Sequence, residues 1–481
     1  MTGDVQYPPT QPTLLRRRAI LAISLTLCCV VPAAGQYPAG SAGAAQAGAL
    51  SGSVPSGPPS SEALRLTLRD AIARALRYNL ATIESGQNAQ IARGQRLLAL
   101  SNLLPQVSVG LSENVEQLSL ATFGLQQIQG IPNISGPFSY TSVDATASQT
   151  IFSFESIQRF RAARTAEQAA QLSYQDVLDA VTLTVGNAYL QVTESDSRIQ
   201  AQEAQVCNAR ALYDQALDEV QAGTAPRIEA TRAEVQLHTE EYNLSVARNN
   251  FQLTKLALGR AIGLPLGQQF ELADQVPYSE INPPTVEDAL NIAYKSRGDF
   301  RAALDSEKSA TQTLSAARGE RYPAVGVNGD YGDIGPTLGH SHGDFTFQAG
   351  ISVPIFTGGR IKGEVTQAEA ELQRRKAEAE NVRGQVDYDV RTAFLNLNAA
   401  KEQVAVAKQN VDLANETLAR SKDRFTSGVT DSVEVVQAEQ SLASANDQYI
   451  TSLYDHNLAK LSLARALGVA RTNYQQYLGG K

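Results

Sequence analysis

The stretch Ala393-Phe-Leu-Asn-Leu397-Asn-Ala-Ala400-Lys-Glu-Gln-Val404-Ala-Val-Ala407 decides the fold of this chain. Apolar residues and alanines recur in it at alternating steps of four and three residues, and the spacing continues through Val411, Ala414 and Leu418. This spacing is the seam of a coiled coil with small side chains at the contact. Taken alone, the seam fits plain coiled-coil packing and also the wall of a helical duct.

The helix that carries this seam is predicted to be very long. No proline occurs in the stretch 359–425, and roughly 65 helical residues make a rod on the order of 100 Å long. The rod ends at the glycine turn Ser427-Gly-Val-Thr430, after which a second helix returns. Residues 154–221 repeat the rod with a more polar seam, up to the turn Ala222-Gly-Thr-Ala-Pro226. We therefore expect two long helical hairpins, over residues 154–262 and 359–468.

The two hairpins belong to a tandem duplication. The stretch Leu66-Thr-Leu-Arg-Asp-Ala-Ile72 matches Pro284-Thr-Val-Glu-Asp-Ala-Leu290 at an offset of 218 residues. Later segments keep an offset of 205: residues 186–190 match 391–395, and 256–263 match 461–468. An offset that holds across about 80 residues is hard to obtain by chance. The predicted repeats are residues 62–275 and 276–470.

Each repeat opens with a helix and continues with two strands before its hairpin. Thr67 and Thr285 are predicted helix caps, each followed three residues later by an aspartate, and the helices should end at Pro105 and Pro323. The period then changes to two. Strands of about ten residues with one apolar face suit a membrane barrel wall, and a soluble sandwich with one hydrated face is the alternative. The predicted strands cover residues 106–116, 140–152, 324–331 and 345–356.

Four strands per chain cannot close a barrel, and two strand pairs alone would leave exposed edges. We therefore expect several chains to share one barrel and to bring their rods together as one tube. A trimer would supply twelve strands.

The two ends of the chain are predicted to lie outside the folded repeats. Three arginines at positions 16–18, an apolar run from Ala19 to Val31 and the small residues after it form a secretory signal over residues 1–35. Residues 36–61 are almost entirely Gly, Ala, Ser, Pro and Gln, which predicts a disordered lead-in. Residues 471–481 form a C-terminal tail. Cys28 follows Leu27 rather than a small residue, so lipidation is not expected.

The composition of the 481 residues excludes several classes of function. The 41 Lys and Arg against 49 Asp and Glu give a net charge of −8, which argues against nucleic acid as a partner. Once the signal is removed, Cys207 is the only cysteine left, so no intrachain disulfide can form. The single Met and 4 His give no support for a soft-metal relay. The cargo therefore stays open among drugs, secreted polypeptides and small metabolites.

No catalytic constellation emerges, so we predict no enzymatic activity, no cofactor and no metal. His238 and His456 lie within helical patterns. His340 and His342 lie in a glycine-flanked loop that either binds a metal weakly or, as we expect, is simply solvated. The glycine-rich segment 329–335 lacks the helix start that a phosphate cradle requires. A periplasmic coiled-coil structural or interaction protein without a pore is the remaining alternative, and the apolar-faced strands argue against it.

With these parts in place, the chain resembles the TolC family of outer-membrane efflux ducts over residues 62–470. Three stretches carry the resemblance most specifically: Gly223-Thr-Ala-Pro-Arg-Ile-Glu229, Gly428-Val-Thr-Asp-Ser-Val-Glu434 and Ser352-Val-Pro-Ile-Phe-Thr-Gly-Gly-Arg360. The resemblance implies a mainly α-helical chain whose homotrimer builds a twelve-stranded β-barrel in the lipid of the outer membrane and an α-barrel across the periplasm. It also implies docking to a periplasmic adaptor protein and an inner-membrane pump, in a tripartite efflux or type I secretion system.

The resemblance further implies which residues narrow and dock the periplasmic mouth. By this resemblance, Glu434 matches an acidic position that narrows the channel. Gln437 stands where a second acidic residue is expected. The trimer is therefore expected to have one ring of carboxylates rather than two. Three Glu434 carboxylates around a threefold axis would repel one another and attract cations. Glu229 holds the matching place in the first repeat and is expected to make tip-to-tip hydrogen bonds. The tips that face the adaptor are Gly223, Thr224, Gly428, Val429 and Thr430.

Overall fold

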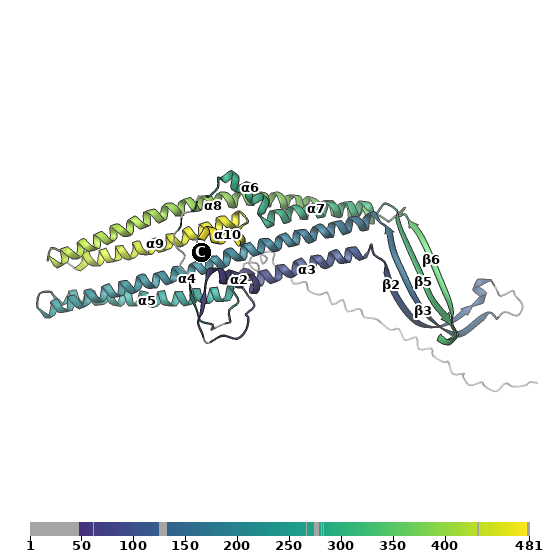
Figure 1. Cartoon of the computed structure of the whole chain (residues 1–481), viewed down its shortest axis with the longest axis horizontal. Coiled ribbons are helices and arrows are strands. Elements are labelled where there is room, and N and C mark those ends of the chain that lie inside the picture. The colour runs from purple at the N-terminus through teal and green to yellow at the C-terminus, as the bar shows by residue number, and fades with distance from the viewer. Residues whose placement is uncertain are drawn as a thin grey trace, which may run out of the picture. The chain divides into compact units, whose positions relative to one another are not determined.

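The computed structural model describes residues 48–60, 62–124, 132–265, 267–273, 279, 281, 283–430 and 432–478. The predicted signal over residues 1–35 lies outside them. Two long helical hairpins and one four-stranded sheet make up most of the described chain (Figure 1). In both repeats a pair of strands precedes a hairpin.

The first repeat contains β1 (Leu64–Leu66), α2 (Leu68–Tyr78), α3 (Leu80–Ser101), β2 (Gln106–Ser119), β3 (Ile134–Phe152), α4 (Phe154–Gln221), α5 (Arg227–Ala261) and β4 (Phe270–Leu272). The second contains α6 (Val286–Ser296), α7 (Gly298–Gly319), β5 (Ala324–Gly335), β6 (His342–Ser352), α8 (Arg360–Thr426) and α9 (Ser432–Ala466), and α10 (Ala470–Leu478) follows. Helices α4 and α8 have 68 and 67 residues, so each is about 100 Å long.

Each repeat begins with two helices where the sequence predicts one. The predicted caps are confirmed, because Oγ1 of Thr67 accepts a hydrogen bond from the backbone N–H of Asp70 at 3.1 Å, and Thr285 caps α6 in the same way. Helix α2 ends early at Asn79, whose backbone is extended and whose side chain caps α3. The buried Asn79 amide also donates to the carbonyl oxygens of Leu50 and Ala261. These tertiary hydrogen bonds explain the break.

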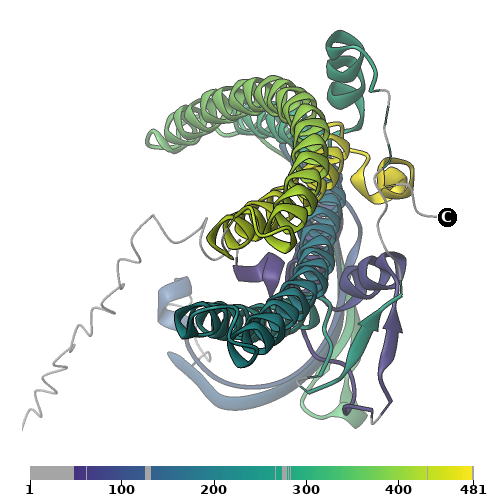
Figure 2. The same ribbon diagram turned by 90° about the vertical axis from the view of Figure 1, so that its left-hand side faces the viewer.

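The long helices pack along the predicted seam. Helix α8 packs on α9, α4 packs on α5, and the two hairpins meet through α4 and α9. The seam of α8 is confirmed: Ala393, Leu397, Ala400, Val404, Ala407 and Leu418 are buried, and Val411 and Ala414 are half-buried. Figure 2 shows α2, α6, α10 and the parallel pair β1–β4 together on one side of the long helices.

The sheet is antiparallel in the order β2-β3-β5-β6. Its strands extend beyond the predicted bounds at the turns, and β6 ends at Ser352, two residues before Pro354, which cannot donate to a ladder. One face is apolar and open, with Val109, Tyr331 and Phe345 each more than 70% exposed. The opposite face is polar, and hydroxyl pairs such as Ser108 with Thr146 link its strands. The alternation predicted from the sequence is therefore present in three dimensions.

Two predicted end segments differ from the structure. Residues 48–60, within the predicted disordered lead-in, run along the helices: the backbone N–H of Val54 donates to Tyr78 at 2.9 Å, and that of Ser56 donates to Gly263 at 3.2 Å. The predicted tail is helical as far as Leu478, which is 1% exposed and lies in the core beside α4. Apolar anchors in α10 and backbone hydrogen bonds in the lead-in fix these segments. Composition alone does not reveal such partners.

Among the helices of the described ranges, none has an apolar run long enough to cross a lipid bilayer.

Candidate functional site at the hairpin tips

Both hairpins turn in the same way. Gly223 and Gly428 have φ angles of 73° and 69°, in the left-handed region that favours glycine. One residue further on, the backbone N–H of Thr224 donates to Glu219 at 3.0 Å, and that of Val429 donates to Arg424 at 2.9 Å. These bonds close a Schellman motif at each helix end. The duplicated sequence therefore folds into duplicated tips, as the glycine turns predict.

The second tip holds Glu434 on the first turn of α9. Oγ1 of Thr430 donates to Oε2 of Glu434, and Oγ of Ser421 donates to Oε1 at 3.4 Å. Nε of Arg424 lies 3.6 Å from Oε1, and the Glu434 side chain is 35% exposed. The carboxylate is thus held against the turn of its own hairpin but keeps contact with solvent.

The first tip is connected to the second by a hydrogen bond. Oγ of Ser432, at the start of α9, donates to Oε2 of Glu229 on α5. Nη1 of Arg232 binds the other oxygen of Glu229 at 2.9 Å. The structure therefore brings Glu229 to the second hairpin. The sequence carries no signal that pairs Ser432 or Arg424 with a tip glutamate, although Ser432 lies within the tip motif at 428–434.

Gln437 lies one turn beyond Glu434 and is exposed. Its carbonyl oxygen accepts a hydrogen bond from Ser441. The position at which the resemblance implies a second carboxylate is thus open to solvent in one chain. Of the predicted docking residues, Gly223, Thr224, Gly428 and Val429 are exposed and Thr430 is half-buried.

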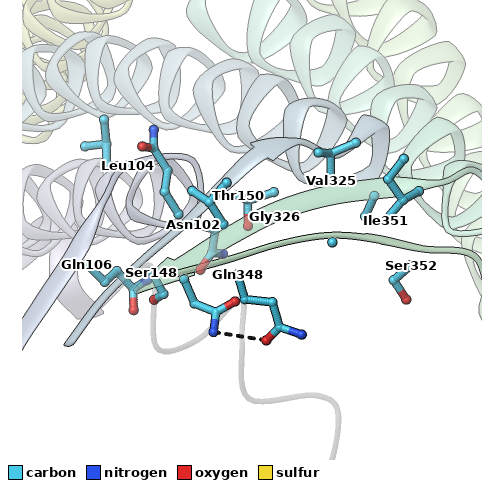
Figure 3. A pocket seen from close by; sticks show the side chains of 15 residues that line it. Asn102, Leu104, Gln106, Ser148, Thr150, Val325, Gly326, Gln348, Ile351 and Ser352 are labelled. Carbon is cyan, nitrogen blue, oxygen red and sulfur yellow. Dashed lines mark hydrogen bonds between the residues drawn. The ribbon is translucent and has the colours of Figure 1, made fainter. Parts of the chain in front are cut away.

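A second feature lies at the other end of the long helices, where the sheet begins. A hollow of about 500 Å³ is lined by Asn102 and Leu104, just after α3, and by all four strands β2, β3, β5 and β6 (Figure 3). Asn102, Gln106, Asn328 and Gln348 supply amides to its wall, and Nδ2 of Asn328 donates to Oε1 of Gln348 at 3.4 Å. Its lining residues carry no charged side chain. The polar face of the sheet therefore continues as a neutral, hydrogen-bonding surface to the first residues of the helical part.

The junction between sheet and helices is fixed by Glu320, directly after α7. Its side chain is 4% exposed and accepts from Arg159 of α4 at 3.0 Å and from Arg360 of α8 at 2.7 Å. One buried carboxylate thus joins α4, the end of α7 and α8, which are three of the four helices that lead into or out of the strands. Charge-assisted bonds of this kind are stronger and more specific in geometry than neutral ones.

The fold is similar to that of solved outer-membrane proteins. The outer membrane protein VceC of Vibrio cholerae superposes with a TM-score of 0.71 at 19% identity, over 83% of this chain and 96% of that one. The CmeC outer membrane channel of Campylobacter jejuni gives 0.72 at 16% identity, over 84% and 86%. The class of fold is therefore that of these outer-membrane proteins, with two long hairpins, paired tips and a four-stranded sheet that has one apolar face.

Sequence comparison gives the family. The profile of the outer membrane efflux protein family matches residues 71–264 and 289–469, one match in each repeat. The chain belongs to this family, to which TolC-like proteins also belong. It is therefore an outer membrane protein that extends into the periplasm, and it is not an enzyme.

Named relatives are distant in sequence. The probable efflux pump outer membrane protein TtgC of Pseudomonas putida is 26% identical over 258 residues, which cover 53% of this chain and 51% of that protein. The chain spans about half the length of that relative in this match. The outer membrane efflux protein BepC of Brucella suis is 23% identical over 431 residues, covering 87% and 88%.

Proposed function

We propose that three copies of this chain form the outer-membrane channel of an efflux pump, a passive duct that receives its cargo from a periplasmic adaptor and an inner-membrane pump. The observation that carries the proposal is the unfinished sheet. Within the described residues, β2 and β6 pair on one side only, so both edges are available to further strands. Three such sheets joined edge to edge give twelve strands, with the apolar faces toward lipid and the polar faces toward a lumen.

The long helices support the same assembly. Helix α5 exposes Ile228, Val235 and Tyr242 at intervals of seven residues, each more than half exposed. Helix α8 exposes Leu395, Val406 and Leu413 to a similar extent. Apolar residues spaced by seven or by eleven lie on one face of a helix, as they do in coiled-coil contacts, and no element of the described chain covers these rows. In the proposed trimer the neighbouring chains cover these rows and close the helical tube.

The tips are the proposed mouth of the duct. Gly223, Thr224, Gly428, Val429 and Thr430 form the end that meets the adaptor, and Val429 offers an apolar side chain that is 68% exposed. Glu434 forms the proposed constriction ring, with Gln437 and Glu229 beside it. A single ring gives weaker cation selectivity than two rings, because carboxylates that converge on an axis add their fields.

The cargo is proposed to be set by the pump rather than by this chain. Other relatives at 23–26% identity are outer membrane proteins named for antibiotic efflux, toluene efflux and pyoverdine export. The neutral amide wall of the hollow in Figure 3 agrees with a duct that does not select its cargo by charge at the barrel end. Whether the system exports drugs or secretes proteins therefore depends on the partners.

The direct test is to purify the protein from outer-membrane fractions in detergent, to measure its oligomeric mass and to record its conductance in a planar bilayer. A trimer with discrete channels is the expected result. The test variant is Val406→Glu, which places a charge in the exposed apolar row of α8 and leaves the tips and the sheet unchanged. This charge should weaken the contact between chains and so lower the fraction of trimer. A monomeric wild-type protein that forms no channels would overturn the proposal.

A further inference from the structure

Helix α9 carries a buried carboxylate at the place where the two hairpins meet. Glu439 is 4% exposed, although it follows Glu434 by little more than one helical turn. Its neighbours Ala438 and Leu442 pack with Leu418 of α8, and Leu212 of α4 packs against this cluster. A carboxylate in such a contact is unusual, because burial disfavours its charged form.

Charged groups of both hairpins act on Glu439. Nζ of Lys422, on α8, lies 3.3 Å from Oε1 of Glu439. Glu240, on α5, opposes it with a like charge. The Glu240 carboxylate is held by the side-chain amides of Gln202 of α4 and Gln236, both at 2.6 Å. Among the described residues, α4 contributes this amide and no charge to the site.

The ionised Glu439 is therefore attracted by Lys422 of its own hairpin and repelled by Glu240 of the other hairpin. Lys422 and Glu439 belong to α8 and α9, so their ion pair does not depend on the first hairpin. Glu240 belongs to the first hairpin, so its repulsion acts only while the hairpins are packed. Protonation of Glu439 removes the repulsion and leaves the apolar packing of the cluster in place.

We infer that Glu439 is a proton-sensitive latch, which lets the hairpins pack when it is protonated and loosens their contact when it is ionised. The inference rests on the proposed duct function, in which the hairpins form the wall of the tunnel near its mouth. Acidification of the periplasm would then hold the mouth closed, and neutral pH would leave it easier for an adaptor to open.

The direction follows from the pKa of Glu439. Burial raises this pKa above the ordinary value of 4.5, and Glu240 raises it further, while Lys422 lowers it. A carboxyl group whose pKa is raised by packing binds its proton more tightly in the packed state than in the separated one. The packed state is therefore favoured as the pH falls through the raised pKa. Each unit of difference in pKa between the two states changes their ratio about tenfold.

The test measures the distance between the hairpins in the full-length trimer. Nitroxide labels are placed at Thr239→Cys on α5 and Gln440→Cys on α9, which are exposed and uncharged neighbours of the two glutamates. Cys207, an exposed free cysteine, is replaced by serine. Labelled protein is mixed with an excess of unlabelled protein, so that most trimers contain one labelled chain. Pulsed electron–electron distance measurements are then made from about pH 5 to about pH 8, around the ordinary carboxyl pKa and above it.

Three variants give distinct expectations. Glu439→Gln should keep the short distance at every pH. Lys422→Gln removes the attraction and should move the transition to higher pH, whereas Glu240→Gln removes the repulsion and should move it to lower pH. Opposite shifts of this kind are not expected from a loss of packing alone.

A wild-type distance that does not change with pH would overturn the inference, and so would shifts of Lys422→Gln and Glu240→Gln in the same direction. The trimer mass and conductance of the unlabelled wild-type protein are recorded separately. If the protein conducts but the distance between the labels does not depend on pH, the proposed duct function is supported and the role of Glu439 is contradicted. If the protein forms no channel but the distance changes with pH, the role of Glu439 is supported and the duct function is contradicted.

Discussion

Ser432 at the start of α9 donates a hydrogen bond to Glu229 at the start of α5, and this bond joins the tips of the two hairpins. The two residues are 203 positions apart and hold nearby places in the two copies of the duplicated sequence. The contact therefore links equivalent parts of the two repeats.

The bond between Ser432 and Glu229 should hold the tips together. We expect Ser432→Ala to increase the fraction of time that the reconstituted channel is open by about tenfold, because a hydrogen bond to a charged group contributes about 1.5 kcal/mol or more. Ser427→Ala is the matched control, since its hydroxyl bonds to Asp423 of its own helix. Equal effects of the two changes on single-channel recordings would show that the tip-to-tip bond has no special role.

Glu434 and Gln437 should set the charge selectivity of the pore. Glu434→Gln should lower the preference for cations, and Gln437→Glu should raise it, because the second change adds a carboxylate ring. Reversal potentials in a salt gradient measure both effects. A selectivity that stays the same in Glu434→Gln would remove this residue from the constriction.

Glycine should be needed at the tips because of its backbone conformation there, and not because a side chain would clash with neighbouring atoms. No atom lies within 4 Å of a Cβ built at Gly428, yet its φ is +69°. Gly428→Ala should therefore destabilise the chain by about 1 kcal/mol. Gly384→Ala, in the middle of α8 and equally free of close atoms, should stabilise it by a similar amount. Chemical denaturation compares the two, and a loss of stability in both would contradict the explanation.

Replacing Glu320 should reduce the stability of the protein less than replacing its two arginine partners does. Arg159 and Arg360 are more than half exposed, so after Glu320→Gln they can be hydrated, and we expect a loss of about 1 to 2 kcal/mol. Replacing both arginines by glutamine leaves Glu320 buried without its partners. That loss should be about 3 kcal/mol or more. The thermal midpoint of trimer dissociation measures both, and a greater loss from Glu320→Gln would argue against this account.

Much of the fold could be predicted from the sequence, because its signals are local and periodic. The seam from Ala393 to Leu418, the caps Thr67 and Thr285 and the glycine turns at 223 and 428 each depend on neighbours a few residues away. The duplication reinforced these signals, since the strand pair and the long hairpin each occur twice.

The candidate site was predicted only in part. The positions of Glu229 and Glu434 followed from the resemblance, but their partners Ser432 and Arg424 did not, because the pairing depends on how the hairpins face each other. The ion pair of Lys422 with the buried Glu439 had no sequence signal, since both residues look like ordinary charges on a helix surface. Asn79 similarly resembles any polar residue inside a helix until its hydrogen bonds to Leu50 and Ala261 are known.

The sequence by itself determined the periodic elements, the repeat and the turns, because backbone conformation and side-chain spacing are fixed within a few residues. Tertiary structure alone decided where α2 ends, how residues 48–60 and α10 pack against the long helices, and which carboxylates are buried. Those features depend on contacts between residues as far apart as Ser432 and Glu229. A pattern along the chain carries no information about a partner 203 residues away.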